Sequence, residues 1–190
     1  MRRLYVFNTV SLDGYFTDTN SDMSWAHRPD AEFNAFTQSN AQGGGALVFG
    51  RVTYDLMTKF WPTPMAMESH PIVAERMNSA EKIVFSRTMD EASWTNTKVV
   101  KGDIVAEMRK LKAQTGDNMV IMGSGSIISQ FTEAGLIDEF QIVLCPIVLG
   151  AGRTLFGGVT TRPALRRTHA RTFKNGNIFL RYEPEPSIHL

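Results

Sequence analysis

The amino-acid sequence predicts an α/β sandwich built on a mostly parallel sheet. Short apolar runs of the kind that fill buried strands alternate along the chain with segments whose apolar side chains recur at helical spacing. Near the end of the chain, two strand-like runs flank an Asn-Gly pair, the strongest short signal for an antiparallel hairpin. With no repeat and no linker in the sequence, we expect one domain over residues 1–183 and a disordered tail over 184–190.

Bulk composition fits a single globular domain. The chain has 190 residues, of which 43% are hydrophobic, and its net charge of +1 favours neither nucleic acid nor a membrane surface. The first apolar run is broken by Asn8 and is too short for a signal peptide or a membrane span. Cys145 is the single cysteine, so no disulfide can form within the chain. We therefore expect a cytoplasmic protein in which Cys145 is a small buried hydrophobe.

The first strand is expected over residues 4–10, which are apolar or aromatic nearly throughout. Asp13 and Gly14 follow this strand, and the pair is typical of a turn. An acidic residue just past a central strand is also where α/β sheets place chemistry. Asp13 is therefore either a turn residue or a residue that takes part in chemistry. The Asp13-Gly14 pair by itself favours the turn.

The middle of the chain continues the alternation. A helix is expected over 29–40, a buried strand over 46–49, and then a helix whose apolar face carries Leu56, Met57 and Phe60. Residues 60–64 form a rigid proline loop, in which Trp61 is either core or the wall of a ligand pocket. The next expected elements are a short helix over 71–79, strands over 83–85 and 98–100, and a helix that Asp103 caps and Gly116 closes.

The last part of the chain is expected to be mostly strand. A long strand over 139–148 contains Pro146, which suggests an edge strand or a bulge. A mobile glycine-rich loop over 150–158 follows, and the terminal hairpin pairs 165–173 with 178–182. Arginines gather in this region, where they more often form a solvated face or a charged edge than a nucleic-acid site; they are Arg162, Arg166, Arg167 and Arg171.

The stretch over 118–134 carries the clearest functional signal. A buried strand over 119–122 leads through Gly123-Ser124-Gly125-Ser126 into a helix that Gly135 ends. The first turn of a helix has unpaired N–H groups and attracts anions, and glycines let the backbone approach a phosphate closely. The alternative is a tight turn that needs glycine for its dihedrals alone. Ile128 stands where the dinucleotide fingerprint has its third glycine, so the match is partial.

Two other strand ends carry groups that favour anions. Gly50 and Arg51 begin a helix that contains Thr53, although an arginine at a helix start opposes the helix dipole unless an external anion neutralises it. Ser86 and Arg87 end the next strand. Because the carboxyl ends of parallel strands meet at one edge of a sheet, these groups and the glycine turn suit an extended ligand with a pyrophosphate and a further phosphate. That describes NADPH better than NADH.

Other chemistries find little support in the sequence. The histidines have no metal-ligand spacing, so no metal site is expected. The zinc-deaminase signature, the nucleophile elbow of hydrolases and the Walker phosphate loop are all absent.

Together these motifs resemble the dihydrofolate reductase superfamily. The shared strand ends are S-L-D-G after the first strand, G-R-x-T at Gly50–Thr53 and S-R at Ser86–Arg87. The run from Gly123 to Phe156 is similar to the reductase domain of the bifunctional deaminase/reductase of riboflavin biosynthesis and to its stand-alone relatives; it contains A-G-L-I-D-E-F and P-I-V-L-G-A-G-R-T-L-F. The similarity covers nearly the whole chain, and the deaminase half is missing.

This resemblance implies a dihydrofolate-reductase-like, three-layer sandwich with a mixed eight-stranded sheet, and a homodimer. The leading hypothesis places Asp13 beside the nicotinamide of NADPH, as the acid that orients substrate or relays a proton, and expects Trp61, Leu155 and Phe156 to contact substrate. Folate-reducing relatives keep an acid on the first helix where this chain has Phe33 and Asn34, so folate-type protonation is not expected. The implied cofactor-binding residues are Thr9, Gly50, Arg51, Thr53, Ser86, Arg87, Gly123, Ser124, Gly125 and Ser126.

The function expected from these observations is an NADPH-dependent reductase. Its substrate would be a small heterocycle of pteridine or pyrimidine type, or a carbonyl or imine compound, and the protein would orient substrate and cofactor while the cofactor supplies the hydride. The alternative is a non-catalytic module that binds NADP(H) or another nucleotide. The sequence leaves the identity of the substrate open.

Overall fold

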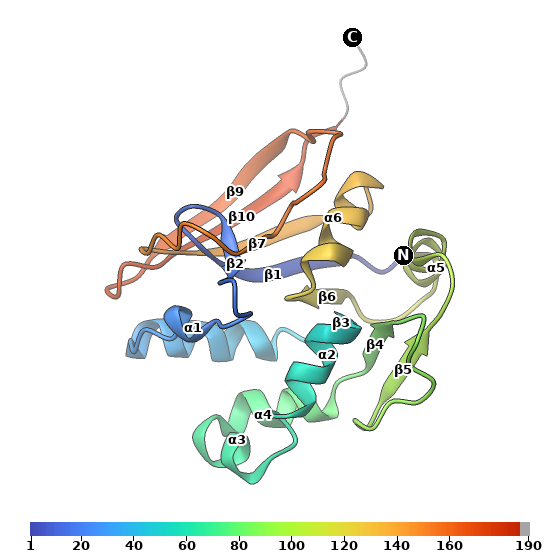
Figure 1. The fold of residues 1–190 in the computed structure, drawn as a ribbon, viewed down its shortest axis with the longest axis horizontal. Coiled ribbons are helices and arrows are strands. Elements are labelled where there is room, and N and C mark those ends of the chain that lie inside the picture. The colour runs from blue at the N-terminus through green and yellow to red at the C-terminus, as the bar shows by residue number, and fades with distance from the viewer. Residues whose placement is uncertain (187–190) are drawn as a thin grey trace.

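The computed structural model describes residues 1–186 and shows an α/β fold around one large sheet (Figure 1). The strands are β1 (Leu4–Ser11), β2 (Tyr15–Thr17), β3 (Ala46–Gly50), β4 (Lys82–Phe85), β5 (Thr97–Val100), β6 (Met119–Met122), β7 (Glu139–Cys145), β8 (Arg153–Thr154), β9 (Leu165–Thr172) and β10 (Ile178–Pro184). The helices are α1 (Ala31–Gln42), α2 (Arg51–Thr58), α3 (Pro64–Ser69), α4 (Pro71–Ser79), α5 (Ile104–Ala113) and α6 (Gly125–Glu133), with one 3-10 turn at Ser24–Ala26.

The large sheet has eight strands in the order β5-β4-β3-β6-β1-β7-β10-β9. The strands from β5 to β7 run parallel, whereas β10 pairs antiparallel with both β7 and β9. This arrangement confirms the predicted mixed, mostly parallel sheet with a terminal hairpin. A separate antiparallel pair joins β2 to β8.

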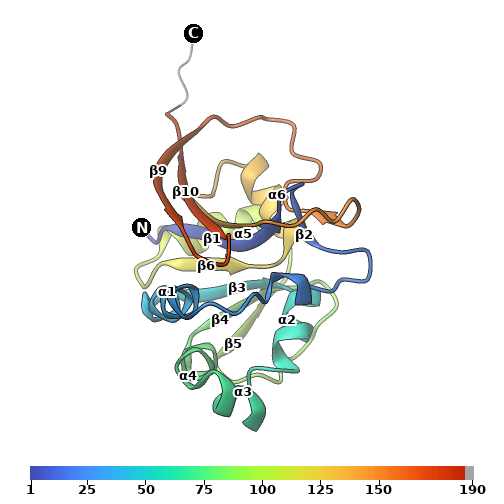
Figure 2. The ribbon, with the colours of Figure 1, turned by 90° about the vertical axis from the view of Figure 1, so that its left-hand side faces the viewer.

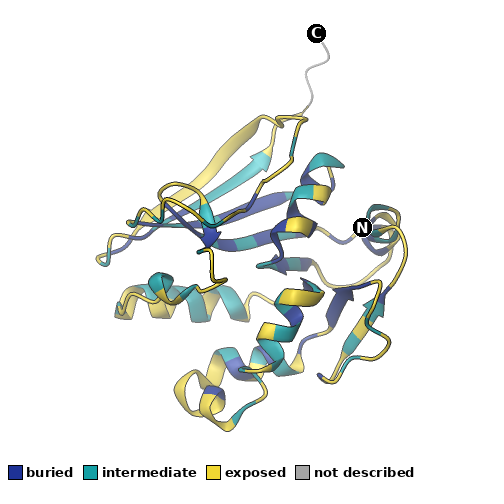
Figure 3. Cartoon of the chain, viewed as in Figure 1, coloured by how far each residue is buried: buried dark blue, intermediate teal, exposed yellow. Residues whose placement is uncertain are grey.

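Helices cover both faces of the sheet, as Figures 1 and 2 show. Successive side chains of a strand point to opposite faces, so Val48 packs in the core on the α5 and α6 side, while Leu47 and Phe49 pack in a second core with residues of α2 and α4. A third cluster lies under α1, where Phe36 packs against Phe179 with ring centroids 4.7 Å apart. Figure 3 shows the central strands dark and β9 yellow, because every residue of β9 is exposed.

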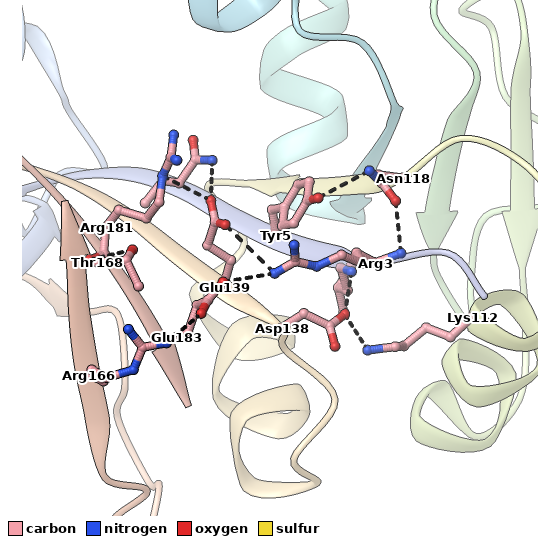
Figure 4. A network of polar contacts seen from close by, with 12 residues as sticks. Arg3, Tyr5, Lys112, Asn118, Asp138, Glu139, Arg166, Thr168, Arg181 and Glu183 are labelled. Atoms are coloured by element: carbon pink, nitrogen blue, oxygen red, sulfur yellow. Dashed lines mark hydrogen bonds and ion pairs between the residues drawn. The ribbon is translucent and has the colours of Figure 1, made fainter. Parts of the chain in front are cut away.

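Polar contacts fasten the amino-terminal end of the sheet (Figure 4). Glu139 lies 3.2 Å from Arg181 and 3.8 Å from Arg3, and Asp138 accepts a 2.7 Å hydrogen bond from the amide of Leu4. Lys112 of α5 pairs with the same Asp138 at 2.5 Å. This network joins β1, β7 and β10 at the edge opposite the strand ends that the sequence marks as functional.

The structure differs from the sequence-based expectations where contacts are not local. The long strand ends at Cys145, before Pro146, and β7 lies between β1 and β10, so the expectation of an edge or a bulge at Pro146 was wrong. The rigid proline loop continues into α3, because Thr63 caps this helix with its side chain and Pro64 takes the first helical position. The strands β2 and β8 were not predicted, and the whole of β8 falls in the loop expected to be mobile.

Two further expectations concern the tail and the cysteine. Of the tail expected over 184–190, Pro184 is the last residue of β10, the amide of Glu185 bonds the carbonyl of Ala164, and residues 187–190 lie outside the described residues. Cys145 is fully buried, and burial raises the pKa of its thiol to about 11. Over residues 1–186, no helix is long and apolar enough to cross a membrane.

Candidate functional site

The strand ends that the sequence marks as anion-friendly are neighbours in the sheet. In the order β4-β3-β6-β1, the end of β4 carries Ser86 and Arg87, the end of β3 leads into α2, and the end of β6 leads into the glycine turn. A cavity of about 1590 Å³ runs along this row, larger than the roughly 300–1,000 Å³ of a pocket for one small ligand. All the expected cofactor residues line this cavity: Thr9, Gly50, Arg51, Thr53, Ser86, Arg87, Gly123, Ser124, Gly125 and Ser126.

A buried asparagine holds the glycine turn in its unusual conformation. Gly123 and Ser124 are both left-handed, with φ of 60° at each, a conformation that costs a non-glycine residue roughly 1–2 kcal/mol. The side chain of Asn8, which is 4% exposed, accepts a 2.9 Å hydrogen bond from the Gly123 amide and donates a 3.2 Å bond to the Gly123 carbonyl. Asn8 therefore binds both the amide and the carbonyl of Gly123, the residue at which the backbone bends. Sequence analysis treated this residue only as a break in an apolar run.

The glycine turn and the start of α2 form one unit. The Ser124 amide donates to the Thr53 hydroxyl at 3.0 Å, and the Gly50 amide donates to the Ser124 hydroxyl at 2.9 Å. The Ser124 hydroxyl also donates to the Met122 carbonyl at 3.3 Å, so its hydrogen already has an acceptor. A methyl group at Gly123 would lie 2.8 Å from the Thr53 methyl, which shows how closely the two turns approach. Thr53 keeps a hydroxyl hydrogen with which to bind a ligand.

Several donors remain available at the start of α6. Ser126 is exposed and lines the cavity, and the amides of Gly125 and Ser126 have no acceptor within residues 1–186. These amides lie at the positive end of the helix dipole, where an anion is stabilised. The site can therefore bind a phosphate at the end of β6.

Two arginines line the cavity at the neighbouring strand ends. Arg51 pairs with Asp55 on the next turn of α2 at 3.4 Å, and both side chains are about half exposed, so the pair is worth roughly 1 kcal/mol or less. Arg87 forms no ion pair with a described residue. The hydroxyl of Ser86 accepts from the amides of Thr88 and Met89, so Ser86 also stabilises the turn that carries Arg87.

The residues expected to contact substrate fall into two groups. Trp61 lines the cavity, and its indole N–H donates to the sulfur of Met57 at 3.1 Å. Leu155 and Phe156 do not line it, because Leu155 is 1% exposed within the main core and the Phe156 ring packs against Phe140 with centroids 5.8 Å apart.

Asp13 follows the end of β1, and it does not line the cavity. It accepts hydrogen bonds from the Ser11 hydroxyl at 2.6 Å, the Gly150 amide at 2.7 Å and the Leu149 amide at 3.2 Å. The bond from Ser11 is the main cause that lowers the pKa of Asp13 to about 2. A carboxylate held in this way is ionised at neutral pH and joins two loops.

The cavity is also lined by residues that were not predicted to bind a ligand. The loop before α1 contributes His27, and α1 contributes Phe33, Asn34 and Gln38 on its inner face. Within the part of the chain that the structure describes, the one carboxylate residue of the cavity lining is Asp103, which caps α5 through the Ala106 amide at 2.8 Å. No local pattern marks the loop residues, because their place depends on how the chain packs over the sheet.

The fold and the row of strand ends define a protein of dihydrofolate-reductase-like architecture. The chain belongs to the family described as the RibD C-terminal domain, which matches residues 2–179. It is 30% identical to the uncharacterized protein YyaP of Bacillus subtilis over 182 residues, covering 95% of this chain and 94% of that one.

Solved structures agree with this assignment. The "Putative riboflavin biosynthesis protein" of Shewanella sp. PV-4 superposes with a TM-score of 0.75 at 27% identity, covering 97% of this chain and 99% of that chain. Dihydrofolate reductase of Enterococcus faecalis, complexed with NADP(H) and RAB-propyl, superposes with a TM-score of 0.64 at 13% identity and covers 97% of both chains, which shows the shared fold. The relatives support a reductase-type function for this family member.

Proposed function

We propose that this protein is an NADPH-dependent reductase of a small heterocyclic, carbonyl or imine substrate. The observation that carries the proposal is the row of three neighbouring strand ends, which presents arginines, hydroxyls and free amides to one cavity of about 1590 Å³. This donor set suits a long, strongly anionic ligand, and the cavity is large enough to hold a second, smaller molecule beside it.

The residues of the row match the parts of the cofactor. Arg51, Arg87 and Ser86 would bind the phosphate of the adenosine ribose, because they are the cations and hydroxyl at the ends of β3 and β4. The amides of Gly125 and Ser126 would bind the pyrophosphate. When bound, NADPH supplies the hydride that the protein itself cannot provide. Asn8 holds the turn that presents these amides.

We propose a positioning role for Asp13 in place of a proton relay. Its carboxylate accepts from the Ser11 hydroxyl and from the loop amides of Gly150 and Leu149, and these bonds, the one from Ser11 foremost, lower its pKa to about 2. A general acid needs a pKa near the working pH. Trp61 remains the candidate wall of the substrate pocket.

A non-catalytic module that binds NADP(H) is the alternative. The test is to titrate the protein with NADPH by fluorescence and then to follow oxidation of NADPH with a panel of quinone, imine, carbonyl and pyrimidine acceptors. Binding with turnover of at least one acceptor supports the reductase, and binding without turnover of any acceptor favours the module. Absence of NADPH binding contradicts both.

We also propose that the protein is a homodimer in the cytoplasm. The apolar run over 140–149 lies mostly in β7, which is not an edge strand, so an exposed strand edge does not explain a dimer. Support comes instead from half-buried apolar side chains on one face of β7 and β10, among them Ile142, Leu144 and Leu180, and from Phe156, which is 41% exposed. Light scattering is expected to give twice 21.2 kDa, and a clean monomer at micromolar concentration would contradict the dimer.

A further inference from the structure

The segment between β7 and β9, residues 146–164, forms a strap over the protein, and its residue Arg153 lines the cavity. Figure 2 shows this orange segment beside β2, with which its short strand β8 pairs. Its middle is fixed to the body of the protein by the buried side chain of Leu155, whose carbonyl accepts a 3.3 Å bond from the Ser129 hydroxyl of α6.

Carboxylates fasten both ends of the strap. At the first end, Asp13 accepts from the amides of Leu149 and Gly150. At the other end, Glu133 accepts from the amide and the hydroxyl of Thr160, at 2.8 Å and 2.6 Å. The bond from the Ser11 hydroxyl, together with these amide bonds, lowers the pKa of Asp13 to about 2, and the bonds from Thr160 lower the pKa of Glu133 to about 2. Both carboxylates are therefore charged at neutral pH. Asp13 and Glu133 therefore fix the two ends of the strap to the rest of the protein.

The strap lies directly on the glycine turn. A Cβ built on Gly125 would lie 2.7 Å from the ring of Phe16 in β2 and 3.4 Å from the carbonyl of Thr154 in β8. A side chain at Gly152 would collide with the carbonyl of Thr17, so the backbones of β2 and of the residue before β8 are in close contact. These approaches bring β8 next to the first residues of α6.

Arg153 is the charged residue that the strap brings to this place. It begins β8, it lines the cavity together with Gly125 and Ser126, and it forms no ion pair with a described residue. Arg87, by contrast, lies at the end of β4, two strands away from β6. With strands about 4.8 Å apart, these two ends are separated by roughly 10 Å. The cavity thus has cations at both ends of the row.

We propose that Arg153 is the counter-cation of the cofactor's pyrophosphate, and that Asp13 positions it through the strap. This inference rests on the proposed function. The two ends of the row then have different roles. Arg51 and Arg87 recognise the phosphate that distinguishes NADPH from NADH, whereas Arg153 binds the pyrophosphate that both cofactors share. The guanidinium and the helix N-terminus bind the same anion from opposite sides.

The test compares three nucleotides in equilibrium titrations: NADPH, NADH and adenosine 2′-monophosphate, which has no pyrophosphate. In Arg153→Met, which keeps the apolar stem, the Kd values of NADPH and NADH are expected to rise by the same factor, about tenfold to a hundredfold. The Kd of adenosine 2′-monophosphate is expected to stay unchanged. Arg162→Asn is the control, because it removes a charge from the same strap and asparagine tolerates the left-handed backbone of this residue.

The positioning role of Asp13 is tested by a double-mutant cycle. Asp13→Ala alone is expected to weaken NADPH binding, but to add little in the Arg153→Met background, because its effect passes through Arg153. A purely structural role would weaken adenosine 2′-monophosphate as well and would add fully in the double variant.

Three results would overturn the inference. Unchanged NADPH affinity in Arg153→Met would refute the role of Arg153 while leaving the proposed function standing, as would an equal loss for adenosine 2′-monophosphate. A wild-type protein that binds neither dinucleotide would refute the proposed function and the inference together.

Discussion

Asn8 is the residue on which the shape of the candidate site depends most. Replacing it by alanine leaves the amide and the carbonyl of Gly123 without protein partners in a partly buried place. Each unsatisfied buried polar group costs about 1–3 kcal/mol, so Asn8→Ala is expected to lower the free energy of unfolding by roughly 2–4 kcal/mol. Because the left-handed Gly123 and Ser124 lose their support, NADPH binding is expected to weaken more than tenfold.

Urea denaturation followed by circular dichroism measures the first effect, and fluorescence titration with NADPH measures the second. Asn118→Ala is the matched control. Asn118 also makes two hydrogen bonds, accepting from the Arg3 amide and donating to the Tyr5 hydroxyl, but it is exposed and lies at the opposite end of the sheet. The control is expected to lose about 1 kcal/mol or less and to bind NADPH normally. If Asn8→Ala were as stable as the control, the asparagine would not be holding the turn.

Two further predictions concern the turn and the strap. Gly125→Val is expected to lower both stability and NADPH affinity, because its side chain would meet Phe16 at less than van der Waals distance; thermal unfolding and titration measure this, and wild-type values for both would contradict the packing. Asp13 and Glu133 have pKa values near 2 in the folded protein, below their ordinary values, so their stabilisation is present above about pH 5 and is lost as the pH falls toward 2. The melting temperature of Asp13→Asn/Glu133→Gln should therefore fall less steeply than that of the wild type below about pH 5, and parallel curves would argue against these anchors.

The strand ends of the candidate site could be predicted because each is a local pattern. A buried run followed by glycine, a hydroxyl and an apolar helix face identifies the junctions at Gly50 and Gly123 from a few neighbouring residues, and the geometry of parallel sheets brings their ends to one edge. In the structure the three strands that carry these ends, β4, β3 and β6, are direct neighbours in the sheet.

The groups that hold the site together could not be predicted, because their partners are distant in sequence. Asn8 bonds a residue 115 positions away, and Asp13 bonds an amide 137 positions away. From local sequence, an asparagine within a strand indicates only a weak point, and an acid after a strand indicates either a turn or chemistry. The two-residue strand β8 shows the same limit, since a glycine-rich loop gives no local sign of its pairing with β2.

The preference between NADPH and NADH tests the central claim most directly. Arg51 and Arg87 line the cavity at adjacent strand ends, and the exposed pair of Arg51 with Asp55 is weak enough to yield to a phosphate. Charge-assisted bonds of roughly 1.5–3 kcal/mol each predict that the wild type binds NADPH about a hundredfold more tightly than NADH, and that Arg51→Ala/Arg87→Ala removes most of this difference while NADH binding barely changes. Equal affinity of the wild type for the two cofactors in a fluorescence titration would contradict the account.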